Sequence, residues 1–126
     1  VWRELVFPYH CAYGERWDAI HWHSCGDVNA IMSDVNQIPH LHTVEIGPQT
    51  DALAAARIFA ANPEQVLLYK CVDIQKELEH PAPGAQEAVI ENVLAAAEYC
   101  PIKILLEAPS LEPALAFLLK FRAMAG

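Results

Sequence analysis

Along the chain, short apolar runs typical of strands are separated by longer segments in which apolar residues recur every three or four positions. The four strand-like runs start at residues 19, 42, 66 and 102, which places the starts 23, 24 and 36 residues apart. This spacing is typical of βα units, in which a crossover helix separates consecutive parallel strands. The pattern therefore predicts an α/β fold in which four consecutive βα units form one domain over residues 1–126.

Capping and breaking residues set the expected boundaries. Thr50 and Asp51 are suitable N-caps for an alanine-rich helix, and Pro63 and Pro101 separate helices from the strands that follow. Pro81 and Pro83 exclude a continuous helix between residues 73 and 84. The predicted strands are 19–23, 42–46, 66–70 and 102–106, and the predicted helices are 8–17, 28–35, 52–61, 85–99 and 112–124.

Four parallel βα units fit two architectures. They form either a small open doubly wound sheet or one half of an eight-stranded barrel, and the pattern does not decide between the two. In both architectures the chemistry lies at the carboxyl ends of the strands. No glycine-rich phosphate-binding motif follows any of the predicted strands, which argues against the nucleotide-binding versions of these folds.

Composition narrows the class of protein. Eight basic and sixteen acidic residues give a net charge of −8, so the chain is a poor candidate for binding nucleic acid or an anionic membrane. No apolar run approaches the ~18 residues of a membrane span. The four cysteines form no C-x-x-C pair and the first residues do not resemble a secretory signal, so we expect a cytoplasmic protein with reduced thiols. Hydrophobic residues make up 54% of this short chain, which indicates either that a partner covers the excess or that the chain is part of a larger fold.

The end of the first predicted strand carries the strongest chemical signal. Because side chains alternate along a strand, His21, His23 and Cys25 face the same way, and the Cβ atoms of His23 and Cys25 stand about 6–7 Å apart. An imidazole nitrogen and a thiolate at that spacing reach one Zn²⁺. Zinc with two or three protein ligands keeps an open position that stabilises a substrate thiolate. In the plainer interpretation the strand end is half-buried, His23 hydrogen-bonds to backbone groups, and Cys25 serves only to pack against its neighbours.

The other strand ends add candidates for substrate binding. Glu45 lies near the end of the second strand, and Lys70 and Cys71 lie at the end of the third. Lys70 is a candidate pocket cation, and Glu107 follows the fourth strand. Two carboxylates on separate strands do not by themselves establish an acid–base pair.

Several motifs resemble the uroporphyrinogen decarboxylase-like superfamily. The first strand ends in His23-Ser24-Cys25-Gly26, which is similar to the H-x-C-G motif of that superfamily. The resemblance covers essentially the whole chain and implies that residues 1–126 correspond to the C-terminal half of a TIM barrel, strands five to eight, with the first four absent. The other matching segments are Phe7-Pro8-Tyr9, Glu15-Arg16-Trp17, Val44-Glu45-Ile46 and Val72-Asp73.

The resemblance implies an enzymatic function. The superfamily contains tetrapyrrole decarboxylases and zinc-dependent methyltransferases that move methyl groups between corrinoid proteins and thiols such as coenzyme M. The H-x-C-G motif belongs to the methyltransferase-like branch, so the resemblance implies that His23 and Cys25 bind zinc. The later cysteine of that branch is replaced here by Leu106-Glu107-Ala108-Pro109, which leaves Glu107 or Cys71 to supply a third ligand.

Two alternatives stay open beside this hypothesis. One is a metal-free decarboxylase in which Lys70 orients a tetrapyrrole or another carboxylated substrate. The other is a non-catalytic half-barrel that self-associates through its open sheet edges. We therefore expect an incomplete portion of an enzyme, a small-molecule substrate or a corrinoid protein as its partner, and homo-oligomers formed through the open surfaces of the half-barrel.

Overall fold

The computed structural model describes residues 1–75 and 83–126, and its strands form one sheet in the order β1-β2-β3-β4. Every neighbouring pair of strands is parallel. These observations confirm the predicted α/β fold with parallel strands. Each strand also begins within one residue of its predicted start. The strands are β1 (Ile20–Ser24), β2 (Leu41–Ile46), β3 (Leu67–Asp73) and β4 (Ile102–Glu107).

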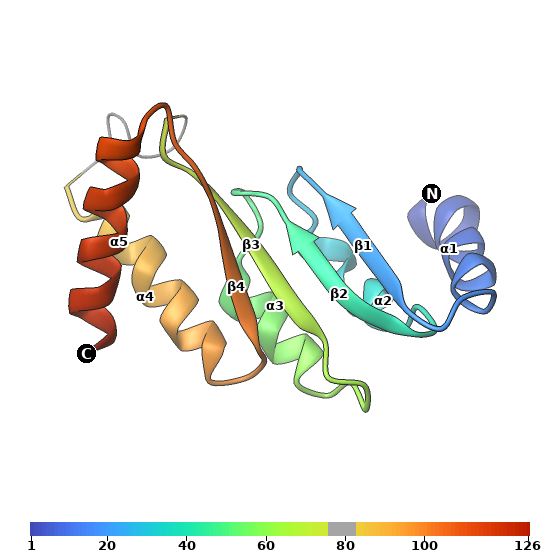
Figure 1. Cartoon of the computed structure of the whole chain (residues 1–126). Helices are drawn as coiled ribbons and strands as arrows, with labels where there is room; N and C mark the ends of the chain where they lie inside the picture. The colour runs from blue at the N-terminus through green and yellow to red at the C-terminus, as the bar shows by residue number, and fades with distance from the viewer. Residues whose placement is uncertain (76–82) are drawn as a thin grey trace.

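Helices alternate with the strands as predicted. Figure 1 shows α2 and α3 behind the sheet, α1 beside β1, and α5 beside α4 at the opposite end. The predicted helix 8–17 ends at residue 14, and the predicted helix 28–35 begins as a 3-10 turn. The helical segments are the π-helical η1 (Trp2–Val6), α1 (Phe7–Gly14), the 3-10 segment η2 (Asn29–Ile31), α2 (Met32–Val35), α3 (Ala52–Phe59), α4 (Ala85–Ala97) and α5 (Leu111–Ala125). The predicted break between 73 and 84 falls largely outside the described residues.

The sheet has one covered and one open face. Trp22, Val44 and Leu68 are buried against the helices, where they form the main hydrophobic core with residues of α2 and α3. A second cluster around Val72 and Phe117 lies between β3, α4 and α5. The alternating positions of the strands carry polar and partly exposed side chains on the open face. Because α2, α3 and α4 pack on the other face, these side chains at the carboxyl ends of the strands point away from those helices.

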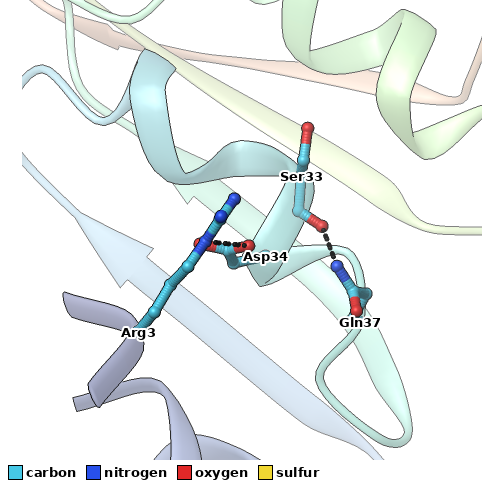
Figure 2. Close-up of polar contacts among 4 residues, drawn as sticks. All are labelled: Arg3, Ser33, Asp34 and Gln37. Carbon is cyan, nitrogen blue, oxygen red and sulfur yellow. Dashed lines mark hydrogen bonds and ion pairs between the residues drawn. The ribbon is translucent and has the colours of Figure 1, made fainter. Parts of the chain in front are cut away.

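An ion pair fastens the N-terminal helical segment to α2. Arg3 Nε donates to both carboxylate oxygens of Asp34, at 3.1 and 2.9 Å, and the Asp34 side chain is only 7% exposed (Figure 2). Just after the end of α2, Gln37 Nε2 donates a hydrogen bond back to the carbonyl oxygen of Ser33 at 3.0 Å (Figure 2). A Cβ at Gly14 would lie 2.6 Å from the Pro39 carbonyl oxygen, so only glycine lets the end of α1 lie this close to the loop that precedes β2.

Asp51 caps α3 and ties it to α4. Its Oδ1 accepts a hydrogen bond from the Ala54 amide at 3.1 Å and from Asn92 Nδ2 at 2.9 Å. Burial raises the pKa of Asp51. Hydrogen bonds from Asn92 and from the backbone amides of Ala54 and Leu53 lower this pKa, as does the charge of Lys70, and together they outweigh burial. The resulting pKa is below the ordinary value of 3.8. The carboxylate form of Asp51 therefore stabilises the fold.

We expect Asp51→Ala to lower the free energy of unfolding by about 1 kcal/mol at neutral pH, as is typical of a lost N-cap. Because the pKa of Asp51 is lowered in the folded state, its contribution is complete above the unfolded pKa and is lost as the pH falls through the folded value. Urea unfolding followed by circular dichroism measures the difference at neutral pH and in acid. An equal difference at both pH values would contradict the assignment, and the exposed Asp18→Ala provides the control.

Candidate functional site

The carboxyl ends of the four strands surround one cavity of about 380 Å³. The cavity brings together five of the six predicted site residues, and Lys70 is the exception. Asp73 also lines the cavity, although the sequence analysis assigned it no role there. The lining residues are His23, Cys25, Glu45, Ile46, Gly47, Pro48, Gln49, Cys71, Asp73 and Glu107.

His23 and Cys25 converge at the end of β1. The distance between His23 Nε2 and Cys25 Sγ is 3.0 Å, and both residues are exposed on the open face. In a tetrahedral zinc site, bonds of about 2.0–2.1 Å to nitrogen and 2.3 Å to sulfur hold the two donors about 3.6 Å apart. A side-chain shift of roughly half an ångström therefore fits the pair to a zinc ion.

Glu45 lies beside His23 on the neighbouring strand. The two residues are register partners in the parallel β1–β2 pair. Glu45 Oε1 lies 3.3 Å from His23 Nδ1, and Glu45 Oε2 lies 3.4 Å from His21 Nε2. The Glu45 side chain is 24% exposed, so solvent screens this carboxylate only in part. The carboxylate thus faces the ring nitrogen of His23 that points away from Cys25.

The loops after β1 and β2 fit closely against each other. A Cβ on Gly47 would lie 2.1 Å from the carbonyl oxygen of Cys25, so only glycine permits this approach. The Gly47 amide donates to the Ser24 carbonyl at 2.9 Å. Thr50 Oγ1 donates to the Gly26 carbonyl at 3.0 Å and accepts from the Val28 amide at 3.1 Å. These contacts fix the backbone that carries Cys25.

Lys70 lies on the covered face of the sheet. It is 5% exposed, and its Nζ donates to the carbonyl oxygens of Gly47, Pro48 and Thr50 at 2.9, 2.7 and 2.7 Å. It lines a separate cavity of about 290 Å³ beside α4. The structure therefore does not bring Lys70 together with the other predicted site residues, because alternation along β3 puts it on the opposite face from Cys71.

Two features of the site were not predicted from the sequence. Alternation along the strand put His21 on the same face as His23 but did not identify Glu45 as the carboxylate that both histidines face. Gly47 was not predicted as the point of closest approach to Cys25. The period of two along the second strand indicated the face on which Glu45 lies, but no local signal in the sequence indicates its pairing with His23 or the approach of Gly47 to Cys25.

In residues 1–75 and 83–126, no group of three or more His, Cys, Asp or Glu side chains is arranged to hold a metal ion. Within the same ranges, no helix is both long and apolar enough to cross a membrane. No protein-family model, no curated protein and no solved structure matches this chain. The geometry of the cavity is therefore the basis on which we propose a function.

Proposed function

We propose that this chain is part of a uroporphyrinogen decarboxylase-like, zinc-dependent methyltransferase that moves a methyl group between a corrinoid protein and a small thiol. The observation that carries the proposal is the 3.0 Å distance between His23 Nε2 and Cys25 Sγ, two residues that line the cavity. Imidazole nitrogen and thiolate sulfur are donors that zinc prefers in proteins. The pair lies at the carboxyl end of a parallel strand, where α/β enzymes carry their chemistry.

The residues of this chain take distinct parts in the proposal. His23 and Cys25 would hold the zinc. Glu107 lines the same cavity and would have to move toward the pair to supply a third ligand, because no three such side chains in the described residues are already arranged around a metal. When bound, zinc stabilises a substrate thiol as its thiolate. Glu45 faces the far side of the His23 ring, and Cys71 lies in the wall against which a substrate would bind. The cavity volume of about 380 Å³ suits a small thiol.

The charges around the cavity favour this function over a metal-free decarboxylase. Glu45, Asp73 and Glu107 line the cavity, so a carboxylated substrate would meet like charges. The decarboxylase alternative uses Lys70 to orient its substrate. The Lys70 ammonium instead donates to three backbone carbonyls on the covered side of the sheet.

We propose further that the four βα units are half of an eight-stranded barrel. Their strands are parallel and lie in sequential order in one sheet, with the cavity at the carboxyl ends. The open face and the exposed leucines of α5 are surfaces that the other half of a barrel would cover. Self-association through these surfaces stays a prediction. The exposed leucines are Leu111, Leu115, Leu118 and Leu119.

Titration of the metal-free chain with Co²⁺ and Zn²⁺ tests the proposal. We expect one metal ion per chain at micromolar concentration, with an absorption band from thiolate–cobalt charge transfer. Cys25→Ser should abolish this band, and His23→Ala should weaken zinc binding at least about 100-fold, because each variant removes a direct ligand. Glu107→Gln should weaken binding about tenfold or more if the third ligand is correct.

Cys11→Ser is the matched control for the thiol. Cys11 lies on α1 and is not among the residues that line the cavity, so its loss should leave the cobalt band and the zinc affinity unchanged. Absence of zinc binding by the wild-type chain would refute the zinc-dependent function. Wild-type affinity in both Cys25→Ser and His23→Ala would refute the assigned site.

A further inference from the structure

Four polar contacts run in one line across the open face of β1 and β2. Thr43 Oγ1 contacts His21 Nδ1, and His21 Nε2 lies 3.4 Å from Glu45 Oε2. Glu45 Oε1 lies 3.3 Å from His23 Nδ1, and His23 Nε2 lies 3.0 Å from Cys25 Sγ. Each ring nitrogen of both histidines therefore has its own polar neighbour.

The Glu45 carboxylate at the centre of this line of contacts determines which ring nitrogen of each histidine carries the proton. An ionised carboxylate accepts hydrogen bonds and cannot donate them. A lone pair on His23 Nδ1 would face the negative charge of Glu45, whereas an N–H at Nδ1 faces it favourably. The same argument puts an N–H on His21 Nε2 and leaves His21 Nδ1 to accept from the Thr43 hydroxyl.

We propose that Glu45 is a positioning residue that fixes neutral His23 as the Nδ1–H tautomer, so that the Nε2 lone pair faces Cys25 and the cavity. His21 and Thr43 hold Glu45 in turn, because His21 faces the second carboxylate oxygen. The Glu45 side chain is 24% exposed, so solvent screens its charge only in part, although each histidine side chain is 47% exposed.

The significance of this tautomer rests on the proposed zinc site. Neutral histidine binds a metal through its unprotonated nitrogen, and a carboxylate on the other ring nitrogen orients the ring and raises its basicity. With Nδ1 protonated, His23 presents Nε2 to the same space as Cys25 Sγ. The opposite tautomer would turn a proton toward that space and exclude metal binding there. The tautomer itself can be measured in the metal-free chain.

Long-range proton–nitrogen correlation NMR of the nitrogen-labelled, metal-free chain tests the inference at mildly alkaline pH, where imidazole is neutral. In the wild type we expect His23 to show a protonated Nδ1 and an unprotonated Nε2. In Glu45→Gln, which is nearly isosteric, the fixed charge is gone and we expect a shift toward the Nε2–H form or a mixture. Glu45→Asp keeps the carboxylate and should retain more of the Nδ1–H form than Glu45→Gln.

Glu64→Gln is the matched control, because it removes a carboxylate that lies 3.8 Å from Nδ1 of another histidine, His40, and leaves Glu45 beside His23. It should leave the tautomer of His23 unchanged. A wild-type His23 in the Nε2–H form, or the same tautomer in wild type and Glu45→Gln, would overturn the inference.

A parallel zinc titration separates this inference from the proposed function. Loss of the second contact of a ligating histidine weakens metal binding about 10–100-fold, so Glu45→Gln should lower zinc affinity by that factor. Wild-type zinc affinity in Glu45→Gln would overturn the positioning role. If the wild-type chain binds no zinc but shows the expected tautomers, the proposed function fails while the role of Glu45 in fixing His23 stands.

Discussion

Replacing Gly47 with alanine is expected to lower the free energy of unfolding by about 3 kcal/mol and to move Cys25 away from His23. The added Cβ would lie 2.1 Å from the Cys25 carbonyl oxygen and 2.6 Å from its carbonyl carbon. Both neighbours are backbone atoms, so the ends of β1 and β2 must separate. This separation also strains the hydrogen bond from the Gly47 amide to the Ser24 carbonyl.

Gly26→Ala is the matched control for Gly47→Ala. Gly26 lies in the same pair of loops, but a Cβ there meets no atom within 4 Å. Urea unfolding should therefore place Gly26→Ala within about 0.5 kcal/mol of the wild type. Zinc affinity should fall in Gly47→Ala and stay near the wild-type value in Gly26→Ala. Equal unfolding midpoints for the two variants would show that the approach of Gly47 to Cys25 does not limit the fold.

Lys70→Met is expected to lower the free energy of unfolding by about 3 kcal/mol. Methionine has a similar length but cannot donate, so the carbonyls of Gly47, Pro48 and Thr50 lose a charged donor in a buried place. Hydrogen bonds to a charged group contribute about 1.5–3 kcal/mol each, and partial rehydration of the loop offsets part of the loss. Thermal and urea unfolding by circular dichroism measure the change.

Lys103→Met is the control for Lys70→Met. Lys103 lies on the next strand, is exposed, and places its Nζ 5.1 Å from the centre of the Tyr69 ring. A cation–π contact at such a site contributes about 0.5–1 kcal/mol. We therefore expect a clearly smaller loss of stability in Lys103→Met. Similar losses in the two variants would contradict a structural role for the three carbonyl contacts of Lys70.

The position of Lys70 was within reach of sequence reasoning. It stands between Leu68 and Val72 at the period of a strand, and both of these apolar neighbours are fully buried. The alternation therefore indicates the covered face. The identity of the acceptors was out of reach, because the three carbonyls belong to a loop about twenty residues earlier in the chain.

The partnership of His23 with Glu45 depends on a feature that the sequence does not show. Ile20 pairs with Leu41, but His21 pairs with Thr43, so the register shifts by one residue at the start of β1. Without this shift His23 would be paired with Val44 and not with Glu45. Register is set by the packing of the covered face against the helices, where Trp22 and Val44 are buried.

The sequence by itself determined the βα order, the parallel strands and the convergence of His23 and Cys25. These follow from local periodicity and from the alternation of side chains along one strand. The tertiary structure alone decided which carboxylate faces His23, which residue permits the approach to Cys25, and which groups surround the Lys70 ammonium. Each of these depends on the register and packing of segments that are distant in the chain, and such contacts are fixed by the whole core and not by any local pattern.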